Sequence, residues 1–142
     1  MSELTPYLAV HDARAAIAWY VDHLGAEVTV EAIVMPDGRV GHVELTVDGA
    51  RWMMSDEHPE IQVEAPMAGR GAAVTLHLTV ADVDAATNRA VAGGANLDRG
   101  PDRGAARPVR APLVPQPAAL SWLHLLGPTG RTGSPSTRTP AG

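Results

Sequence analysis

Three side chains in this sequence combine metal-binding or hydrogen-bonding groups with a regular spacing: His42, Glu44 and His77. His42 and Glu44 alternate with apolar residues, so both side chains project from one face of a strand. His77 alternates with leucines in the same way and lies on the polar face of a second strand. Imidazole and carboxylate groups on a half-exposed sheet more often form hydrogen bonds than bind a divalent metal ion. We favour hydrogen bonding and keep the metal set as the alternative.

Five further residues on the polar faces are candidates for contact with a ligand. Thr5 and Tyr7 alternate with apolar residues near the start of the chain, and Thr75 does so at the start of the second strand. Arg51 and Met53 project from the same face of a third strand. The guanidinium of Arg51 can bind an anionic group as a planar fork of donors, or it can remain solvated at the rim of the sheet.

The strands that carry these residues belong to a repeat. The pattern T-x-x-L-x-V-x-D occurs at residues 5–12 and again at residues 75–82. The aspartate that ends each copy is a favoured helix N-cap, and apolar residues follow it at helical spacing. Gly25 and Gly94 then mark the ends of the two helices. Trp19 lies off the first apolar stripe and is expected to mark a partner surface. The predicted stripes are Ala13, Ala16, Ile17, Tyr20, Val21 and Leu24 in the first helix and Val83, Ala86, Ala90 and Val91 in the second.

Three strand candidates follow the first helix, at residues 27–35, 39–47 and 50–55. The turn sequences PDG at 36–38 and DG at 48–49 join them as a meander. The first unit is therefore predicted to be a βαβββ module. Trp52 and Met54 project from the face of this strand opposite to Arg51. We expect both in the core.

The chain divides into four parts by composition. Residues 1–57 form the first module, residues 58–73 are a linker with prolines and glycines, and residues 74–101 begin a second module. Residues 102–142 hold five of the eleven arginines and seven of the twelve prolines, but only one of the sixteen acidic residues. We therefore expect a disordered tail without stable strands, in which only residues 118–126 are apolar enough for a short helix.

Several function classes are excluded by what the sequence lacks. It has no phosphate-binding loop, no Gly-rich nucleotide fingerprint, no nucleophile elbow and no cysteine. We expect no membrane partner, because no apolar run is long enough to cross a bilayer. The tail arginines are not interleaved with aromatic residues, so we expect no nucleic-acid partner. The absence of cysteine suits a reducing compartment, and a cytoplasmic location is expected.

Residues 3–100 resemble the vicinal oxygen chelate superfamily, which includes glyoxalase I, bleomycin-resistance proteins and extradiol dioxygenases. The resemblance is carried by four segments in order: PYLAVHDARAAIAWYVDHLGAEV, MPDGRVGHVEL, RWMMSDE and VTLHLTVADVDA. It implies an α+β fold of tandem βαβββ modules whose sheets form a cup for a small molecule, commonly in a homodimer. Because the family pattern stops early, we expect the second module to be incomplete and the tail to be irregular.

The resemblance also implies where a metal ion would be held. Metal-binding members use His, Gln or Glu on the first and last strands of each module. By the repeat register these positions fall on Thr5, Met53 and Thr75, which are not common metal ligands. We therefore expect no metal cofactor. A divalent metal held by the histidine and glutamate set described above is the alternative.

Three functions are consistent with these features. The favoured one is binding of a small organic molecule in a cup without the usual metal site. The second is a metal-dependent lyase, isomerase or dioxygenase-like enzyme with a non-standard ligand set. The third is a non-catalytic or truncated interaction module. The residues expected to bind the ligand are Thr5, Tyr7, His42, Glu44, Arg51, Met53, Thr75 and His77.

The departure from the family after residue 101 predicts a shift of reading frame. The family introduces its last strand with D-P-x-G-H-R-W, and this motif is absent here. Residues 102–116, read one base later with synonymous codons chosen to match, give TGVLRDPFGHRWFLN. Sequencing the gene across codons 95–120 tests this hypothesis, because the codons must permit the shifted translation. Codons incompatible with it would leave an ordinary tail rich in proline and arginine.

Overall fold

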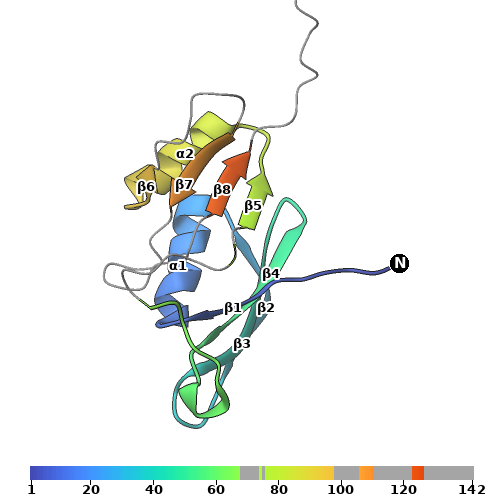
Figure 1. Ribbon diagram of the computed structural model, residues 1–142, viewed down its shortest axis with the longest axis vertical. Helices are drawn as coiled ribbons and strands as arrows, with labels where there is room; N and C mark the ends of the chain where they lie inside the picture. The colour runs from blue at the N-terminus through green and yellow to red at the C-terminus, as the bar shows by residue number, and fades with distance from the viewer. Residues whose placement is uncertain (68–73, 75, 98–105, 111–122, 127–142) are drawn as a thin grey trace, which may run out of the picture.

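The computed structural model describes residues 1–67, 74, 76–97, 106–110 and 123–126. Within these residues the chain builds two units, each with a four-stranded sheet and one α-helix (Figure 1). The prediction of an α+β fold built from tandem modules is confirmed. None of the helices in the described ranges is both long and apolar enough to cross a membrane.

The first module has the predicted βαβββ order. It consists of β1 (Tyr7–Val10), α1 (Ala13–Leu24), β2 (Glu27–Val34), β3 (Val40–Val47) and β4 (Ala50–Asp56). The strand order in the sheet is β1-β4-β3-β2. β1 runs parallel to β4, and the other neighbours are antiparallel. The meander predicted from the two turn sequences therefore forms, and β1 is added to its far edge.

The second module repeats this arrangement. It consists of β5 (Leu76–Thr79), α2 (Val83–Ala92), β6 (Asn96–Leu97), β7 (Ala106–Arg110) and β8 (Leu123–Leu126). The strand order is β5-β8-β7-β6, with β5 parallel to β8. The two sheets thus have the same topology, as the sequence repeat predicts.

The prediction that no strand forms after residue 101 is wrong for two segments. β7 and β8 pair with each other, and β8 also pairs with β5, so the second module has its four strands. Proline at position 108 and the lack of alternation argued against β7. Pairing with long-range neighbours supplies backbone hydrogen bonds that local sequence does not reveal. The rest of the predicted disordered tail lies outside the described residues, and the domain boundaries remain predictions.

Both helices begin as the sequence predicts, and α1 also ends as predicted, whereas α2 ends at Ala92 with Gly93 as its cap, one residue before the predicted Gly94. The Asp12 carboxylate accepts a hydrogen bond from the backbone N–H of Ala15 at 3.1 Å, and Asp82 accepts one from Ala85 at 2.9 Å. Each aspartate satisfies a backbone donor that the first helical turn leaves without a partner. Gly25 ends α1 in the left-handed conformation, with φ of 72°. The two aspartates therefore fix where the helices begin.

A single core joins the two modules. Its largest fully buried side chains are Val40, Val43, Leu45 and Met54, all from β3 and β4. Leu78 on β5 and Ala90 on α2 belong to the same cluster. The predicted core positions Trp52 and Met54 are confirmed, because both are buried on the helix side of the sheet.

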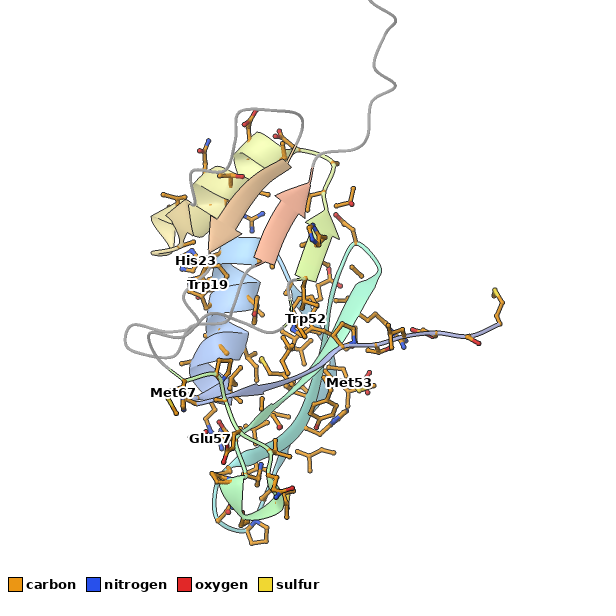
Figure 2. The ribbon with its side chains drawn as sticks, viewed as in Figure 1. Trp19, His23, Trp52, Met53, Glu57 and Met67 are labelled. Carbon is orange, nitrogen blue, oxygen red and sulfur yellow. The ribbon has the colours of Figure 1, made fainter. Side chains whose placement is uncertain are left out.

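The two helices pack together through Trp19, which corrects one prediction. The Trp19 side chain is 8% exposed, and its Nε1–H donates a hydrogen bond of 2.8 Å to the carbonyl of Gly93 at the end of α2 (Figure 2). Trp19 is therefore an internal contact between modules and not a partner surface. Two predicted stripe members, Val21 on α1 and Val91 on α2, are exposed.

Asp56 ties three elements of the first module together. One carboxylate oxygen accepts a hydrogen bond from the backbone N–H of Ala13 at 2.7 Å, and the other accepts one from Val40 at 2.6 Å. The end of β4, the start of α1 and the start of β3 thus share one side chain. Hydrogen bonds to a charged acceptor contribute more than neutral ones, about 1.5–3 kcal/mol each. This contact fixes the helix against its sheet.

Arg39 links the turn between β2 and β3 to the short 3-10 helix η1 (Pro59–Ile61). Its Nε–H donates to Asp37 at 2.7 Å, and its terminal nitrogens donate to the carboxylate of Glu60 and to the carbonyl of Glu57. These hydrogen bonds from the guanidinium lower the pKa of both Asp37 and Glu60. The segment after β4 is thereby held against the sheet.

We expect Gly93→Ala to destabilise the joint between the modules. Gly93 has φ of −83°, which any residue adopts, so backbone strain is not involved. A methyl group there would overlap the ring of His23, and overpacking of this kind costs about 1–3 kcal/mol. Urea unfolding measures the loss. The double variant that adds His23→Ala should recover much of it, and the same loss with and without the ring would refute the contact.

Acid should release the Arg39 network. A carboxylate whose folded pKa is lowered contributes stability above its unfolded pKa, about 4.3 for glutamate, and this stability is lost as the pH falls through the folded pKa. Asp37 and Glu60 are exposed, so the effect is modest and sensitive to salt. The urea midpoint of the wild-type protein should therefore fall more steeply with acid than that of Arg39→Met. Parallel pH profiles for the two proteins would contradict the network.

Candidate functional site

The open face of the first sheet gathers most of the predicted site residues. Tyr7 on β1 lies beside Met53 on β4, and Met53 lies beside Glu44 on β3. His42 precedes Glu44 on the same strand. Tyr7 is half-exposed, and the side chains of His42 and Glu44 are 26% and 23% exposed. Figure 2 shows Met53 on the side of the sheet that faces away from α1.

Three of these side chains form a hydrogen-bonded chain. The Tyr7 hydroxyl lies 3.0 Å from His42 Nδ1, and His42 Nε2 lies 3.0 Å from Glu44 Oε1. The carboxylate of Glu44 can only accept, so the contact assigns the ring proton to Nε2 and leaves Nδ1 as an acceptor. The Tyr7 hydroxyl also lies 3.0 Å from the carbonyl of Gly41. Its single hydrogen thus has two acceptors within reach.

A β-bulge turns His42 toward this face. Val34 on β2 pairs with Val40, but the preceding residue Ile33 pairs with His42, so β3 contains one extra residue there. Val40 therefore points into the core while His42 points outward. Gly41, between them, directs its carbonyl toward Tyr7. The bulge thus supplies both the direction of His42 and the second acceptor for the tyrosine.

Apolar side chains flank the polar chain. Val30 pairs with Glu44 and Ile33 pairs with His42 across β2 and β3, so they share the open face. Val30 is 39% exposed and Ile33 is 55% exposed. Met53 lies on the other side of Glu44 and is half-buried. A ligand on this face would therefore contact the hydrogen-bonded side chains in the middle and apolar side chains on both sides of them.

Arg51 and Thr5 lie near the edge of the same sheet. Arg51 is exposed, and its guanidinium donates to the carboxylate of Glu3 at 2.7 Å. The structure therefore pairs it with an acidic group of the chain itself. Thr5 is half-buried just before β1.

The two predicted residues of the second module are separate from this group. His77 is exposed on β5, in the other sheet from His42 and Glu44. Among the described residues, no three His, Asp or Glu side chains are close enough to hold a metal ion. The alternative metal set of His42, Glu44 and His77 is therefore not assembled there. Thr75 lies outside the described residues.

A second polar cluster lies where β1 and β4 end, and the sequence interpretation missed it. His11 Nδ1 contacts Glu57 Oε1 at 3.0 Å, and its Nε2 contacts the carbonyl of Pro66 at 3.2 Å. The backbone N–H of Ala65 and then His11 lower the pKa of Glu57. The cluster borders a cavity of about 520 Å³ lined by His11, Asp12, Arg14, Asp37, Gly38, Arg39, Asp56, Glu57 and Pro59.

This charged cavity is better explained as a structural joint than as a binding site. Asp12 caps α1, Asp56 bonds two backbone N–H groups, and Arg39 is held by two carboxylates. Arg14 donates to the carbonyl of Gly38 at 3.2 Å. These polar groups already have partners within the chain. No motif in the sequence could have revealed the cluster, because its members come from separate turns.

Curated relatives match part of the chain, and two of them illustrate the likeness. An uncharacterized protein of Mycobacterium bovis is 38% identical over 97 residues, which cover 66% of this chain and 63% of that protein. An uncharacterized protein of Mycobacterium tuberculosis strain H37Rv is 38% identical over 97 residues, covering 66% of this chain and 56% of that protein. The match therefore spans less than two-thirds of the length of either relative.

Solved structures show the same fold. A gene product from Arabidopsis thaliana has a TM-score of 0.66 at 20% identity, covering 89% of this chain and 98% of that chain. A mutant of the fosfomycin resistance protein FosX from Listeria monocytogenes, complexed with Mn(II) and 1S,2S-dihydroxypropylphosphonic acid, has a TM-score of 0.64 at 14% identity, covering 89% and 92% of the two chains. At these identities the likeness concerns the fold alone.

A family model covers most of the described structure. The model described as Glyoxalase/Bleomycin resistance protein/Dioxygenase superfamily matches residues 4–110. This span includes both helices, the whole first sheet and the first three strands of the second sheet. The resemblance read from the sequence segments is thereby confirmed. The chain belongs to the glyoxalase, bleomycin resistance protein and dioxygenase superfamily.

Proposed function

We propose that this protein binds a small organic molecule on the open face of its first sheet without the metal site used by many relatives. The observation that carries the proposal is the chain from Tyr7 through His42 to Glu44. These groups are pre-organised by hydrogen bonds on a rigid sheet, as a binding site requires. The expected family ligand positions on this sheet carry Thr5 and Met53 instead.

The face favours a ligand with an apolar body and one hydrogen-bonding group. Val30, Ile33 and Met53 offer apolar contact on both sides of the polar chain. Glu44 is paired with His42, and Arg51 is paired with Glu3. Neither charge is left over to attract an ionic ligand. Small-molecule sites usually combine an apolar wall with a few fixed polar groups in this way.

A homodimer would complete the site. Small-molecule sites bury most of the surface of their ligand, which one open sheet cannot do. The exposed side chains of Ile33 and Tyr7, 55% and 50% exposed, favour a second covering surface. We place that surface on another copy of the chain.

We also propose a cytoplasmic location, since the sequence has no cysteine for disulfides.

The alternative is a metal-dependent enzyme, for which the FosX structure with Mn(II) is the relevant comparison. It would need a non-standard ligand set built on His42 and Glu44, with His77 supplied by a different arrangement of the two sheets. The direct contact between His42 and Glu44 disfavours it, because a metal would have to replace that hydrogen bond. A non-catalytic interaction module is the third possibility.

Metal analysis and ligand screening separate these functions. We expect the purified protein to hold less than stoichiometric metal, with the same content in His42→Ala, because the histidine is engaged with its neighbours. A bound ligand should stabilise the wild-type protein in a thermal-shift screen, by about 2.7 kcal/mol at a hundredfold excess over Kd.

The matched control is His11→Ala, which removes the other described histidine that pairs with a glutamate. This variant should keep the ligand response, and His42→Ala should lose it. Stoichiometric metal that disappears in His42→Ala would favour the enzyme instead. A screen without any stabilising ligand would favour the interaction module.

A further inference from the structure

We propose that Tyr7, His42 and Glu44 form a proton relay that accepts a proton from a weakly acidic hydroxyl group of the bound molecule. The inference rests on the proposed function, because it assigns chemistry to that same open face. It adds a substrate class, namely small apolar molecules with a phenolic or enolic hydroxyl. It also adds a reaction type, general base catalysis without a metal ion.

The starting point is the tyrosine hydroxyl, which has one hydrogen and two acceptors. The carbonyl of Gly41 and Nδ1 of His42 each lie 3.0 Å from the Tyr7 oxygen. The carbonyl only holds the hydroxyl in position, whereas Nδ1 is a basic nitrogen that can keep the proton. When the hydrogen points to Nδ1, the tyrosine oxygen has a free lone pair for a donor from outside.

Glu44 completes the relay from the other side of the ring. Its carboxylate accepts the Nε2–H of His42 at 3.0 Å, so an imidazolium formed at His42 would have a negative partner already in place. This is the role of the acid in a hydroxyl–histidine–carboxylate triad. Both side chains are about three-quarters buried, so water screens the pair less than on an open surface.

The proton movements balance without any further reactant. The O–H bond of the ligand breaks, and its proton goes to the Tyr7 oxygen while the original tyrosine proton moves to His42 Nδ1. The products are a ligand oxyanion, a neutral tyrosine and an imidazolium between Tyr7 and Glu44. The tyrosine hydroxyl can then donate to the oxyanion. Tyr7 is thus the catalytic residue, and His42 and Glu44 act through it.

The other histidine and glutamate pair cannot work in this way. Both ring nitrogens of His11 face acceptors, the carboxylate of Glu57 and the carbonyl of Pro66. Neither of these contacts is with a hydroxyl group that could pass on a proton. The comparison shows that the tyrosine, rather than the histidine–glutamate contact, makes the relay. It also supplies a matched control.

The probe is 4-nitrophenol, whose phenolate absorbs visible light and whose neutral form does not. At a pH at which the free phenol is neutral, binding to the wild-type protein should raise the phenolate fraction about tenfold, the effect of one pKa unit. Tyr7→Phe removes the contacting hydroxyl, and Glu44→Gln removes the charge behind the ring. Both variants should lose the phenolate band, and Glu57→Gln should keep it.

A second probe, 4-nitroanisole, keeps the apolar body but has no acidic hydrogen. It should bind without a band shift, and circular dichroism checks that each variant is folded. Bound 4-nitrophenol without a phenolate band, or a band that persists in Tyr7→Phe, would overturn the relay. Failure of 4-nitrophenol to bind would overturn it as well. If 4-nitroanisole still binds, the proposed binding function survives; binding of neither probe counts against both.

Discussion

The first sheet is covered by a helix on one face only. This single-sided packing determines which residues of each strand are buried and which are exposed. α1 packs on a single side, so alternate residues of β3 and β4 enter the core and those between them remain outside. Burying a side chain such as Leu45 or Met54 contributes about 1.5–3 kcal/mol. A slip of one residue would expose these side chains and bury His42 and Glu44. The packing on the covered face therefore holds the polar chain on the open one.

One irregularity is needed in addition to this alternation. Without the bulge at Gly41, a strand that buries Val40 would also place His42 on the core side. The extra residue returns His42 to the open face and leaves the Gly41 carbonyl available to the Tyr7 hydroxyl. Asp56 anchors the start of the same strand through the backbone N–H of Val40. The site is thus positioned by backbone geometry as well as by side-chain packing.

The sequence predicted what depends on local pattern. The repeat, the aspartate caps and the alternation of residues 42–47 and 51–54 were sufficient for the first module and for the faces of His42, Glu44 and Trp52. It could not predict β7 and β8, because β8 pairs with the distant strand β5, β7 lies between β8 and β6, and β7 contains a proline. The role of Trp19 was also out of reach, since it depends on how the two helices meet. The alternation also predicts the face of the strand from which His42 projects, but it does not predict which side chains His42 contacts.

The superfamily explains the fold, and the individual side chains carry the functional argument. His42 is held between a hydroxyl and a carboxylate, and we propose that it does not bind a metal ion. The ring ¹⁵N resonances of His42 test it most directly. We expect a protonated Nε2 that responds to Glu44→Gln and an accepting Nδ1 that responds to Tyr7→Phe. Ring resonances that are unchanged by both substitutions but shift when a divalent metal ion is added would show that His42 binds a metal instead.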